Sequence, residues 1–215
     1  MKGVSFLGFH SYRDLHLLLT EKDIGSPEVK RQTIDIEGAD GVLDFTGFFG
    51  EPKYMNAQHR FSFESIQPRN EQLSQFTEIK NKLHGQKGRI ILDDDPSFFY
   101  VGRCFVSAYK NENVIGRITI ECDCEPYKYK AEETVVTRAI NGVVDVNLTN
   151  SRKRAVPLVT IETSSSMNII FGDANVWDLP SGSYMLPELE LVEGENKVTV
   201  TGTGVVSFRW REAML

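Results

Sequence analysis

The sequence predicts a mainly β protein with a single α-helix and two β domains, and three observations lead to this prediction. Most apolar residues fall in short β-branched and aromatic runs that are bounded by Gly, Pro, Asn and Asp. One segment alone, residues 70–84, has its apolar residues at helical spacing. The strand pattern lapses at residues 126–133, so we expect an N-terminal domain over residues 1–130 and a C-terminal domain over residues 131–215.

Length and charge limit the classes of protein to which the chain can belong. Its 215 residues are enough to bury a core without help from disulfides or metals. The 24 Lys and Arg residues against 30 Asp and Glu residues give a net charge of −6. Non-specific nucleic-acid binding and binding to an anionic membrane both depend on a surplus of cations. We therefore expect neither nucleic acid nor a membrane as a specific partner.

The termini and cysteines predict a protein that is made in the cytoplasm. Residues 1–10 lack the continuous apolar segment of a signal peptide, and no window approaches the length of a membrane-spanning helix. The odd number of cysteines (Cys104, Cys122 and Cys124) is typical of reduced thiols. No further Cys or His spacing completes a zinc site, so we interpret the three as small buried hydrophobes and expect no metal and no cofactor.

Alternation and turn residues predict the strands of the N-terminal half. Residues 60–66 alternate cleanly, with Phe61 and Phe63 on one face. The run Asp93-Asp94-Asp95, followed by Pro96, predicts a solvated turn between two strands. The predicted strands of this half are residues 3–9, 29–36, 60–66, 89–92, 98–109 and 114–124.

Residues 70–84 predict an amphipathic helix. Leu73, Phe76, Ile79 and Leu83 recur at spacings of three, three and four residues, and Gly85 stands where a C-terminal cap belongs. A single helix among strands must place its apolar stripe against a sheet, so we expect these four side chains to face the core.

The C-terminal half predicts a β-sandwich of short strands. Asn141-Gly142 is typical of a two-residue hairpin turn, and residues 201–204 (Thr-Gly-Thr-Gly) indicate another reversal. Many short strands in a small domain are the pattern of a sandwich or jelly roll. The predicted strands are residues 134–140, 142–148, 156–162, 167–171, 182–186, 196–201 and 204–210.

No pattern in the sequence predicts an enzyme. Nucleophile elbows, phosphate-binding loops and dinucleotide fingerprints are missing from it. The four histidines (His10, His16, His59 and His84) fall in different predicted elements without metal-ligand spacing. We expect no catalytic residues.

Residues 38–55 are unusual because large apolar side chains stand in a Gly-rich segment without a clear period. Such a segment either folds under its own domain or presents apolar surface to a partner. Its Gly and Pro residues favour the second, an extended arm. The candidate subunit-interface residues are Gly38, Asp40, Gly41, Leu43, Phe45, Phe48, Phe49, Tyr54 and Met55.

Trp177 is the other candidate for binding, because polar residues surround it in a predicted loop. A Trp flanked by Asn and Asp can stack on a sugar ring while its neighbours hydrogen-bond to hydroxyls. It can equally cover the edge of the sandwich, and both interpretations stay open. Trp210 alternates with Phe208 on one strand face, so we expect it in the core.

The order of these elements resembles the distal tail protein (Dit) family of long-tailed bacteriophages and prophages with non-contractile tails. The resemblance covers nearly the whole chain and rests on Gly- and Asp-rich turns in a specific order. The segments that carry it are residues 3–8 with 11–15, residues 36–44, residues 60–63, the helix, residues 89–95 and the ending Leu-Val-Glu-Gly-Glu-Asn-Lys-Val at 191–198.

The resemblance implies a tail-tube-like N-terminal domain, a β-sandwich or split barrel with one helix. It also implies a galectin-like or carbohydrate-module-like C-terminal sandwich. In this family six copies close into a ring that joins the major tail tube protein to tail-tip or baseplate proteins and lets DNA pass. Receptor-binding proteins are further possible partners. The protein would assemble in the host bacterial cytoplasm and reside at the tail tip of the virion, with residues 38–55 reaching a neighbouring subunit.

Two other functions remain as alternatives. A carbohydrate-binding adhesion module would act through the C-terminal sandwich and Trp177. A tail-tip hydrolase is disfavoured, because the sequence shows no acid–base pair and no nucleophile with a base beside it.

Overall fold

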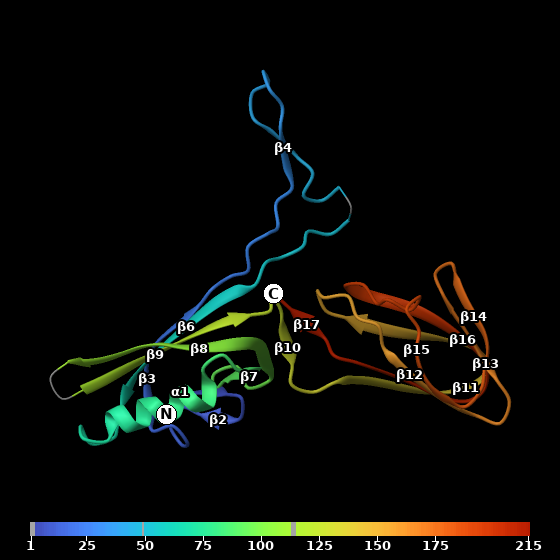
Figure 1. Ribbon diagram of the computed structural model, residues 1–215. Coiled ribbons are helices and arrows are strands. Elements are labelled where there is room, and N and C mark those ends of the chain that lie inside the picture. The colour runs from blue at the N-terminus through green and yellow to red at the C-terminus, as the bar shows by residue number, and fades with distance from the viewer. Residues whose placement is uncertain (1–2, 49, 113–114) are drawn as a thin grey trace. The chain divides into compact units, whose positions relative to one another are not determined.

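The computed structural model describes residues 3–48, 50–112 and 115–215, which form two compact units (Figure 1). The N-terminal unit comprises residues 1–128 with Leu215, and the C-terminal unit comprises residues 129–214. Both units are built from strands, and the single helix of the described residues lies in the N-terminal unit. The prediction of a mainly β chain with one helix is confirmed.

The N-terminal unit contains one antiparallel sheet in the order β2-β1-β7-β8-β9-β6-β3. Hydrogen bonding joins strands far apart in sequence, such as β1 with β7 and β3 with β6. The strands are β1 (Val4–Phe6), β2 (Phe9–His10), β3 (Leu17–Ile24), β6 (Ala57–Ser65), β7 (Lys87–Leu92), β8 (Phe98–Glu112) and β9 (Ile115–Cys124).

This sheet curls around a single core. The ring of Phe6 on β1 meets the rings of Phe61 and Phe63 on β6 edge-on, at centroid distances of 5.4 and 6.0 Å. β1 and β6 are separated by three strands in the sheet, so these contacts require a strongly curved sheet. The curvature agrees with the predicted split barrel.

Three strand predictions in this unit need correction. The turn at Leu7 and Gly8 divides the predicted strand 3–9 into β1 and β2. β3 was not predicted at all, because its residues show no clear alternation. β8 extends beyond the predicted 98–109 to Glu112, and residues 113 and 114 of the predicted turn and strand lie outside the described residues.

The predicted helix is α1 (Gln72–Leu83), which packs on the sheet (Figure 1). Ile79 and Leu83 are buried in the core as expected. Leu73 was predicted to face the core but is 63% exposed, and the buried positions of the first turns belong to Gln72 and Gln75. These side-chain amides donate hydrogen bonds to carbonyl groups of nearby loops, which an apolar side chain would leave without a partner. Gln75 Nε2, for example, donates to the carbonyl of Leu15 at 2.6 Å.

The run Asp93-Asp94-Asp95 forms a turn between β7 and β8, as predicted, but its carboxylates are not simply solvated. Asp93 accepts a hydrogen bond from His10 Nε2 at 3.0 Å. Asp94 forms an ion pair with Lys22, and Asp95 forms one with Lys128 at 2.7 Å. The turn therefore ties together segments that are distant in sequence.

The three cysteines are buried and reduced, as predicted. Cys104 and Cys122 lie opposite each other on β8 and β9 with their sulfurs 3.5 Å apart. The hydrogen bond between them and burial raise the pKa of Cys122, and burial raises the pKa of Cys124 to about 12. Both thiols are protonated at neutral pH and are poor nucleophiles.

The C-terminal unit is organised around two long strands, β11 (Thr134–Asn150) and β16 (Gly194–Trp210), which pair along their whole lengths. The other edge of β16 pairs with β12 near one end and with β13 near the middle. The remaining strands of this half are β10 (Lys128–Lys130), β12 (Leu158–Thr163), β13 (Met167–Phe171), β14 (Ala174–Leu179), β15 (Gly182–Met185) and β17 (Ala213–Met214), of which β17 pairs with β10.

The predicted reversals at Asn141-Gly142 and at residues 201–204 are wrong, because both lie inside continuous strands. Gly142 on β11 faces Gly202 on β16, and both have positive φ. A Cβ on Gly204 would stand 2.2 Å from the carbonyl oxygen of Glu162. These glycines let the β11–β16 ribbon bend, so that β12 and β13 pair with different parts of one strand.

One core fills the C-terminal unit. Val159 on β12, Ile169 on β13 and Val206 on β16 all belong to it. Trp210 is also buried there, as predicted. The segment around Trp177, predicted as a loop, is instead β14, which pairs with β13 at the edge of the sheet.

Candidate assembly surface

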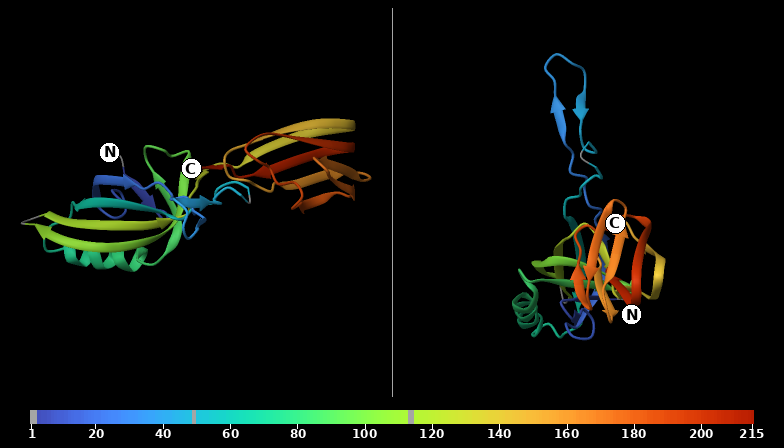
Figure 2. Two further views of the ribbon diagram at one scale, coloured as in Figure 1. Left: turned by 90° about the horizontal axis from the view of Figure 1, so that it is seen from above. Right: turned by 90° about the vertical axis from the view of Figure 1, so that its right-hand side faces the viewer.

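A two-stranded arm leaves the sheet between β3 and β6 and covers residues 28–55 (Figure 2). Its base is held by an antiparallel bridge between Val29 and Tyr54 and by a hydrogen bond from the Met55 amide to the Glu28 carbonyl at 2.7 Å. Farther out, β4 (Thr33–Asp35) pairs with β5 (Val42–Asp44). The arm is therefore longer than the predicted segment 38–55, because the predicted strand 29–36 is its other half.

Glycine is required where the arm begins. The amide of Gly25 donates to the carbonyl of Gln58 at 3.1 Å, which keeps the outgoing and returning backbone segments close together. A Cβ on Gly25 would stand 2.3 Å from that same oxygen. A side chain at this position would force these two backbone segments apart.

The predicted residues Gly38, Asp40 and Gly41 form the turn at the tip of the arm. Both glycines have positive φ, 83° and 78°, which favours glycine over other residues. The Ala39 amide donates to the Ile36 carbonyl within this turn. These residues shape the tip, and all of them are exposed.

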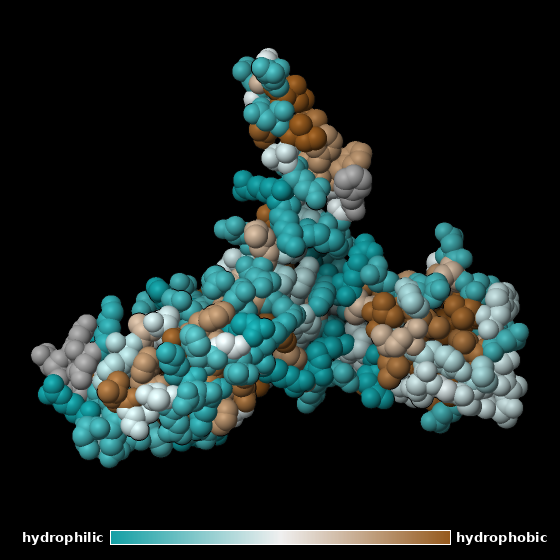
Figure 3. Space-filling model, in the orientation of Figure 1, coloured by the Kyte–Doolittle hydropathy of each residue, from teal (hydrophilic) through white to brown (hydrophobic). Residues whose placement is uncertain are grey.

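The arm has one apolar face. Ile34 on β4 stands directly opposite Leu43 on β5, so their side chains share a face, and Phe45 continues that face two residues later. The ring of Phe48 packs edge-on against that of Phe45 at 5.7 Å. Figure 3 shows hydrophobic side chains gathered on the outer part of the arm.

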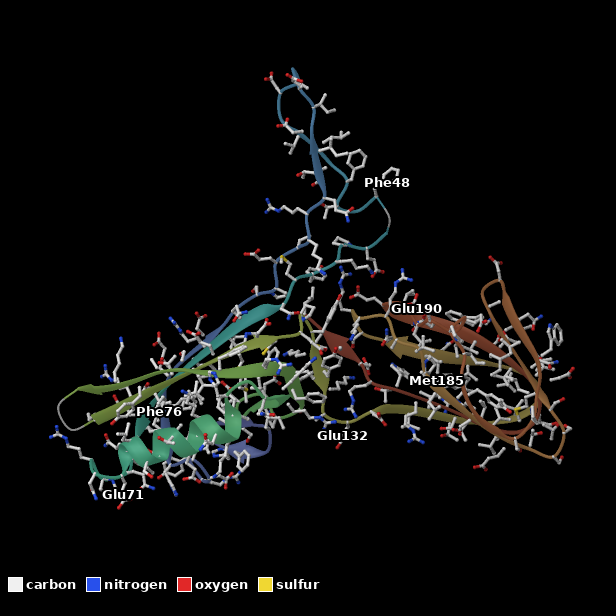
Figure 4. The ribbon with its side chains drawn as sticks, viewed as in Figure 1. Phe48, Glu71, Phe76, Glu132, Met185 and Glu190 are labelled. Atoms are coloured by element: carbon white, nitrogen blue, oxygen red, sulfur yellow. The ribbon has the colours of Figure 1, made fainter. Side chains whose placement is uncertain are left out.

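These apolar side chains remain open to solvent. Phe48 is 71% exposed, and Ile34 and Leu43 are about half exposed. Figure 4 shows Phe48 on the arm, away from the sheet. None of them belongs to a hydrophobic core of the described residues. An exposed apolar cluster of this kind marks a surface for a partner.

The opposite face and the tip of the arm are mainly acidic, although the exposed Val42, which pairs with Asp35, also lies on that face. Residues 33–44 contain four carboxylates and no Lys or Arg: Asp35, Glu37, Asp40 and Asp44. The hydroxyl and amide of Thr46 hydrogen-bond to Asp44 and lower the pKa of its carboxyl below the ordinary value. The arm is thus amphipathic, and the carboxyl of Asp44 is ionised at neutral pH.

The remaining predicted residues lie near the base of the arm. The ring of Tyr54 is half-buried and packs against that of Tyr127 at 6.1 Å, and Met55 is 50% exposed. Phe49 lies outside the described residues. Ile34 was not among the predicted interface residues, although the alternation from Thr33 to Ile36 would have placed it on one face of a strand.

The exposed face of the curved sheet is polar and ion-paired. Arg60 on β6 contacts Glu121 on β9 at 2.6 Å, and Arg117 on β9 contacts Glu64 on β6 at 3.4 Å. These cross-strand pairs neutralise cations that would otherwise be available to an anionic ligand.

The part of the chain that the structure describes holds no recognisable metal site. Among those residues, no three His, Cys, Asp or Glu side chains are grouped to hold a metal ion. None of the described helices is long and apolar enough to cross a membrane.

Comparison with solved structures matches the chain over its full length to a phage protein. The crystal structure of the SPP1 Dit (gp 19.1) protein superposes with a TM-score of 0.73, covering 100% of both chains at 14% sequence identity. The chain has the fold of a Dit protein. SPP1 Dit is described as a paradigm of the hub adsorption apparatus in phages that infect Gram-positive bacteria. No family model and no curated protein sequence matches the chain.

Proposed function

We propose that this chain is a non-enzymatic hub of a long non-contractile phage tail, in which six copies close into a ring. The observation that carries the proposal is the fold match, which covers both domains of a phage hub protein from end to end. The ring would join the major tail tube protein to the tail-tip proteins, with a receptor-binding protein as a further partner.

The arm supports ring formation. A closed ring needs two different patches on each subunit, because every copy contacts one neighbour on each side. The apolar face of Ile34, Leu43, Phe45 and Phe48 supplies one patch, and the surface of the next copy supplies the other. Covering that face on a neighbour would remove the apolar area from water.

The polar face of the curved sheet is suited to a channel for DNA. A lumen with unpaired cationic side chains would bind the DNA phosphates and stop the DNA from passing. Arg60 and Arg117 are already paired with carboxylates on neighbouring strands. We propose that this face lines the channel.

The hub role is tested in the virion. Phage in which the gene for this chain is interrupted should produce tails without tips and without infectivity, and the intact gene should restore both. Virions that lack the chain but carry complete, infectious tails would contradict the proposal.

The arm is tested separately. Replacing residues 28–55 by a short glycine turn leaves the core untouched, so the variant should stay folded by circular dichroism. Light scattering should then show monomers under conditions where the intact chain, alone or with its tail partners, forms annular particles by negative-stain microscopy. Rings of unchanged mass in the variant would contradict the role of the arm without contradicting the hub role.

A further inference from the structure

Trp177 on β14 is a large aromatic side chain that the C-terminal unit leaves 60% exposed. Its placement is determined by a β-bulge. Between the pairs Met167–Leu179 and Ile169–Val176, β14 has one residue more than β13, so Trp177 and Asp178 together face Asn168. The backbone accommodates this extra residue at Asp178, whose φ of 54° lies in the left-handed region.

The bulge is costly for a residue other than glycine, and its effect is to orient a side chain. A non-glycine residue in the left-handed region costs about 1 kcal/mol or more. The Asp178 amide donates to Asn168 Oδ1 at 2.9 Å, which holds the bulge in place. Bulges of this kind re-aim side chains at functional sites, and here the indole is turned outward.

The outward side chains beside the indole include three uncharged polar groups, together with the half-buried Ile170 and the exposed Asp178. Asn168 on β13 stands opposite Thr201 on β16, and Asn175 lies two residues before Trp177 on the same face of β14. The amide nitrogen of Asn168, the amide of Asn175 and the hydroxyl of Thr201 bind no other described side chain or backbone group. They are donors and acceptors available to a ligand.

The charges on β11 and β16 beside these side chains are paired. Asp145 on β11 lies opposite Thr199 of β16, accepts from its hydroxyl at 2.7 Å and pairs with Lys197 at 2.7 Å. Among the described residues, no unpaired cation for a phosphate stands in this row of side chains, and the exposed carboxylate of Asp178 beside Trp177, which forms no ion pair there, would repel an anionic ligand. The face is therefore suited to a neutral ligand.

We propose that this outer face of the β14-β13-β16-β11 sheet binds a neutral saccharide. A pyranose ring has an apolar C–H face and a rim of hydroxyls, which matches an exposed indole beside amide and hydroxyl groups. The ring stacks on Trp177, and its hydroxyls hydrogen-bond to Asn168, Asn175 and Thr201. This inference concerns the C-terminal unit alone and does not depend on ring assembly.

A protein partner fits the face less well. The nearest other strongly exposed apolar side chain of this face, Val143, lies on β11, three strands away from Trp177 on β14, or about 14 Å. Asn168 and Thr201 lie between them. An isolated ring with polar groups around it does not form the contiguous apolar patch of a protein interface.

The test uses the fact that the chain contains two tryptophans, one exposed and one buried. Full-length protein labelled with fluorotryptophan gives separate fluorine signals for Trp177 and Trp210. Neutral oligosaccharides of hexoses and N-acetylhexosamines, and purified neutral wall polysaccharide, are titrated into it. We expect the Trp177 signal to shift saturably and the signal of the buried Trp210 to stay in place.

Variants then assign the binding energy. Trp177→Ala should weaken binding by about tenfold or more, Trp177→Phe by less, and Asn168→Ala by several-fold. Met185→Ala is the matched control, because Met185 is equally exposed but lies on β15, outside this face (Figure 4). It should leave the affinity unchanged. Circular dichroism checks that each variant is folded.

Three results would overturn the proposal. The first is the absence of a saturable Trp177 shift with every neutral saccharide. The second is a Trp177 shift that depends on protein concentration without sugar, which would assign the face to a second copy of the chain. The third is binding of a polyglycerol phosphate in preference to neutral sugars.

Discussion

Two antiparallel ribbons in this molecule, the arm and the β11–β16 pair, have the same local design and opposite surroundings. Each presents mainly apolar side chains on one face and mainly polar side chains on the other. In the β11–β16 ribbon, Leu148 and Val198 are fully buried, because other strands complete a core over them. In the arm, Ile34 and Leu43 stay about half exposed, because none of the described elements covers them.

The difference shows what each ribbon needs for stability. The β11–β16 ladder has 17 residue pairs and a core of its own, whereas the β4–β5 ladder has three. A short two-stranded hairpin is marginally stable in water unless something packs on it. We therefore propose that another molecule completes the apolar face of the arm, which in the proposed ring is the next copy of the chain.

The sharpest test of this contrast is a matched pair of leucines. Leu148→Ala removes a fully buried side chain and should destabilise the chain by about 2–5 kcal/mol. Leu43→Ala removes a half-exposed one and should change stability by less than about 0.5 kcal/mol, while weakening assembly. Urea unfolding measures the first effect, and light scattering of the assembled particle measures the second.

Equal destabilisation by the two leucine variants would show that the arm folds against its own domain. Unchanged assembly of the Leu43 variant would remove its apolar face from the interface.

A matched pair of glycines tests the bend in the β11–β16 ribbon. In Gly204→Ala the new Cβ would meet the Glu162 carbonyl oxygen at 2.2 Å, and φ is 148°, so we expect a loss of about 2–4 kcal/mol. The arm provides the control: in Gly47→Ala the nearest atom is 3.8 Å away, and stability should hold within about 0.5 kcal/mol. Similar unfolding curves for both variants would argue against the bend.

Acidification should have a smaller effect on stability, and this effect should arise in the sheet and not in the arm. His59 on β6 is buried against the ring of Tyr100 at 4.5 Å, and neither ring nitrogen has a hydrogen-bond partner among the described residues. Burial lowers its pKa, so below about pH 6.5 the unfolded chain binds more protons than the folded one. Stability should therefore fall as the pH drops from about 7 to 5.

The variant His59→Leu should lose most of that pH dependence, as urea unfolding at several pH values will show. The arm should be unaffected in the same range, because the hydrogen bonds from Thr46 keep the pKa of Asp44 below its ordinary value of 3.8. An unchanged slope in His59→Leu would assign the pH dependence to other groups.

Sequence patterns predicted those elements whose cause is local. The spacing of Phe76, Ile79 and Leu83, with Gly85 at the end, was enough to place α1. Alternation placed β13 at its observed bounds. The Gly-rich segment with exposed aromatic residues was correctly identified as an extended arm, although its first half was taken for a separate strand.

The sequence-based predictions failed where contacts between residues far apart in the sequence determine the structure. Asn141-Gly142 has the chemistry of a hairpin turn, but Gly142 lies opposite Gly202 and both serve a bend in a long ribbon. A single sequence cannot show that pairing. Leu73 was assigned to the core by its spacing, whereas the loop carbonyls near α1 needed the amides of Gln72 and Gln75.

Photo-crosslinking from the arm tests the central claim most directly. A photo-reactive phenylalanine analogue replaces Phe48, which is 71% exposed, in assembled tails, and a matched sample carries it at Met185. The account predicts a covalent dimer of this chain from position 48 and none from position 185. Crosslinks from position 48 that join only other tail proteins, or a yield no higher than that of the control, would contradict it.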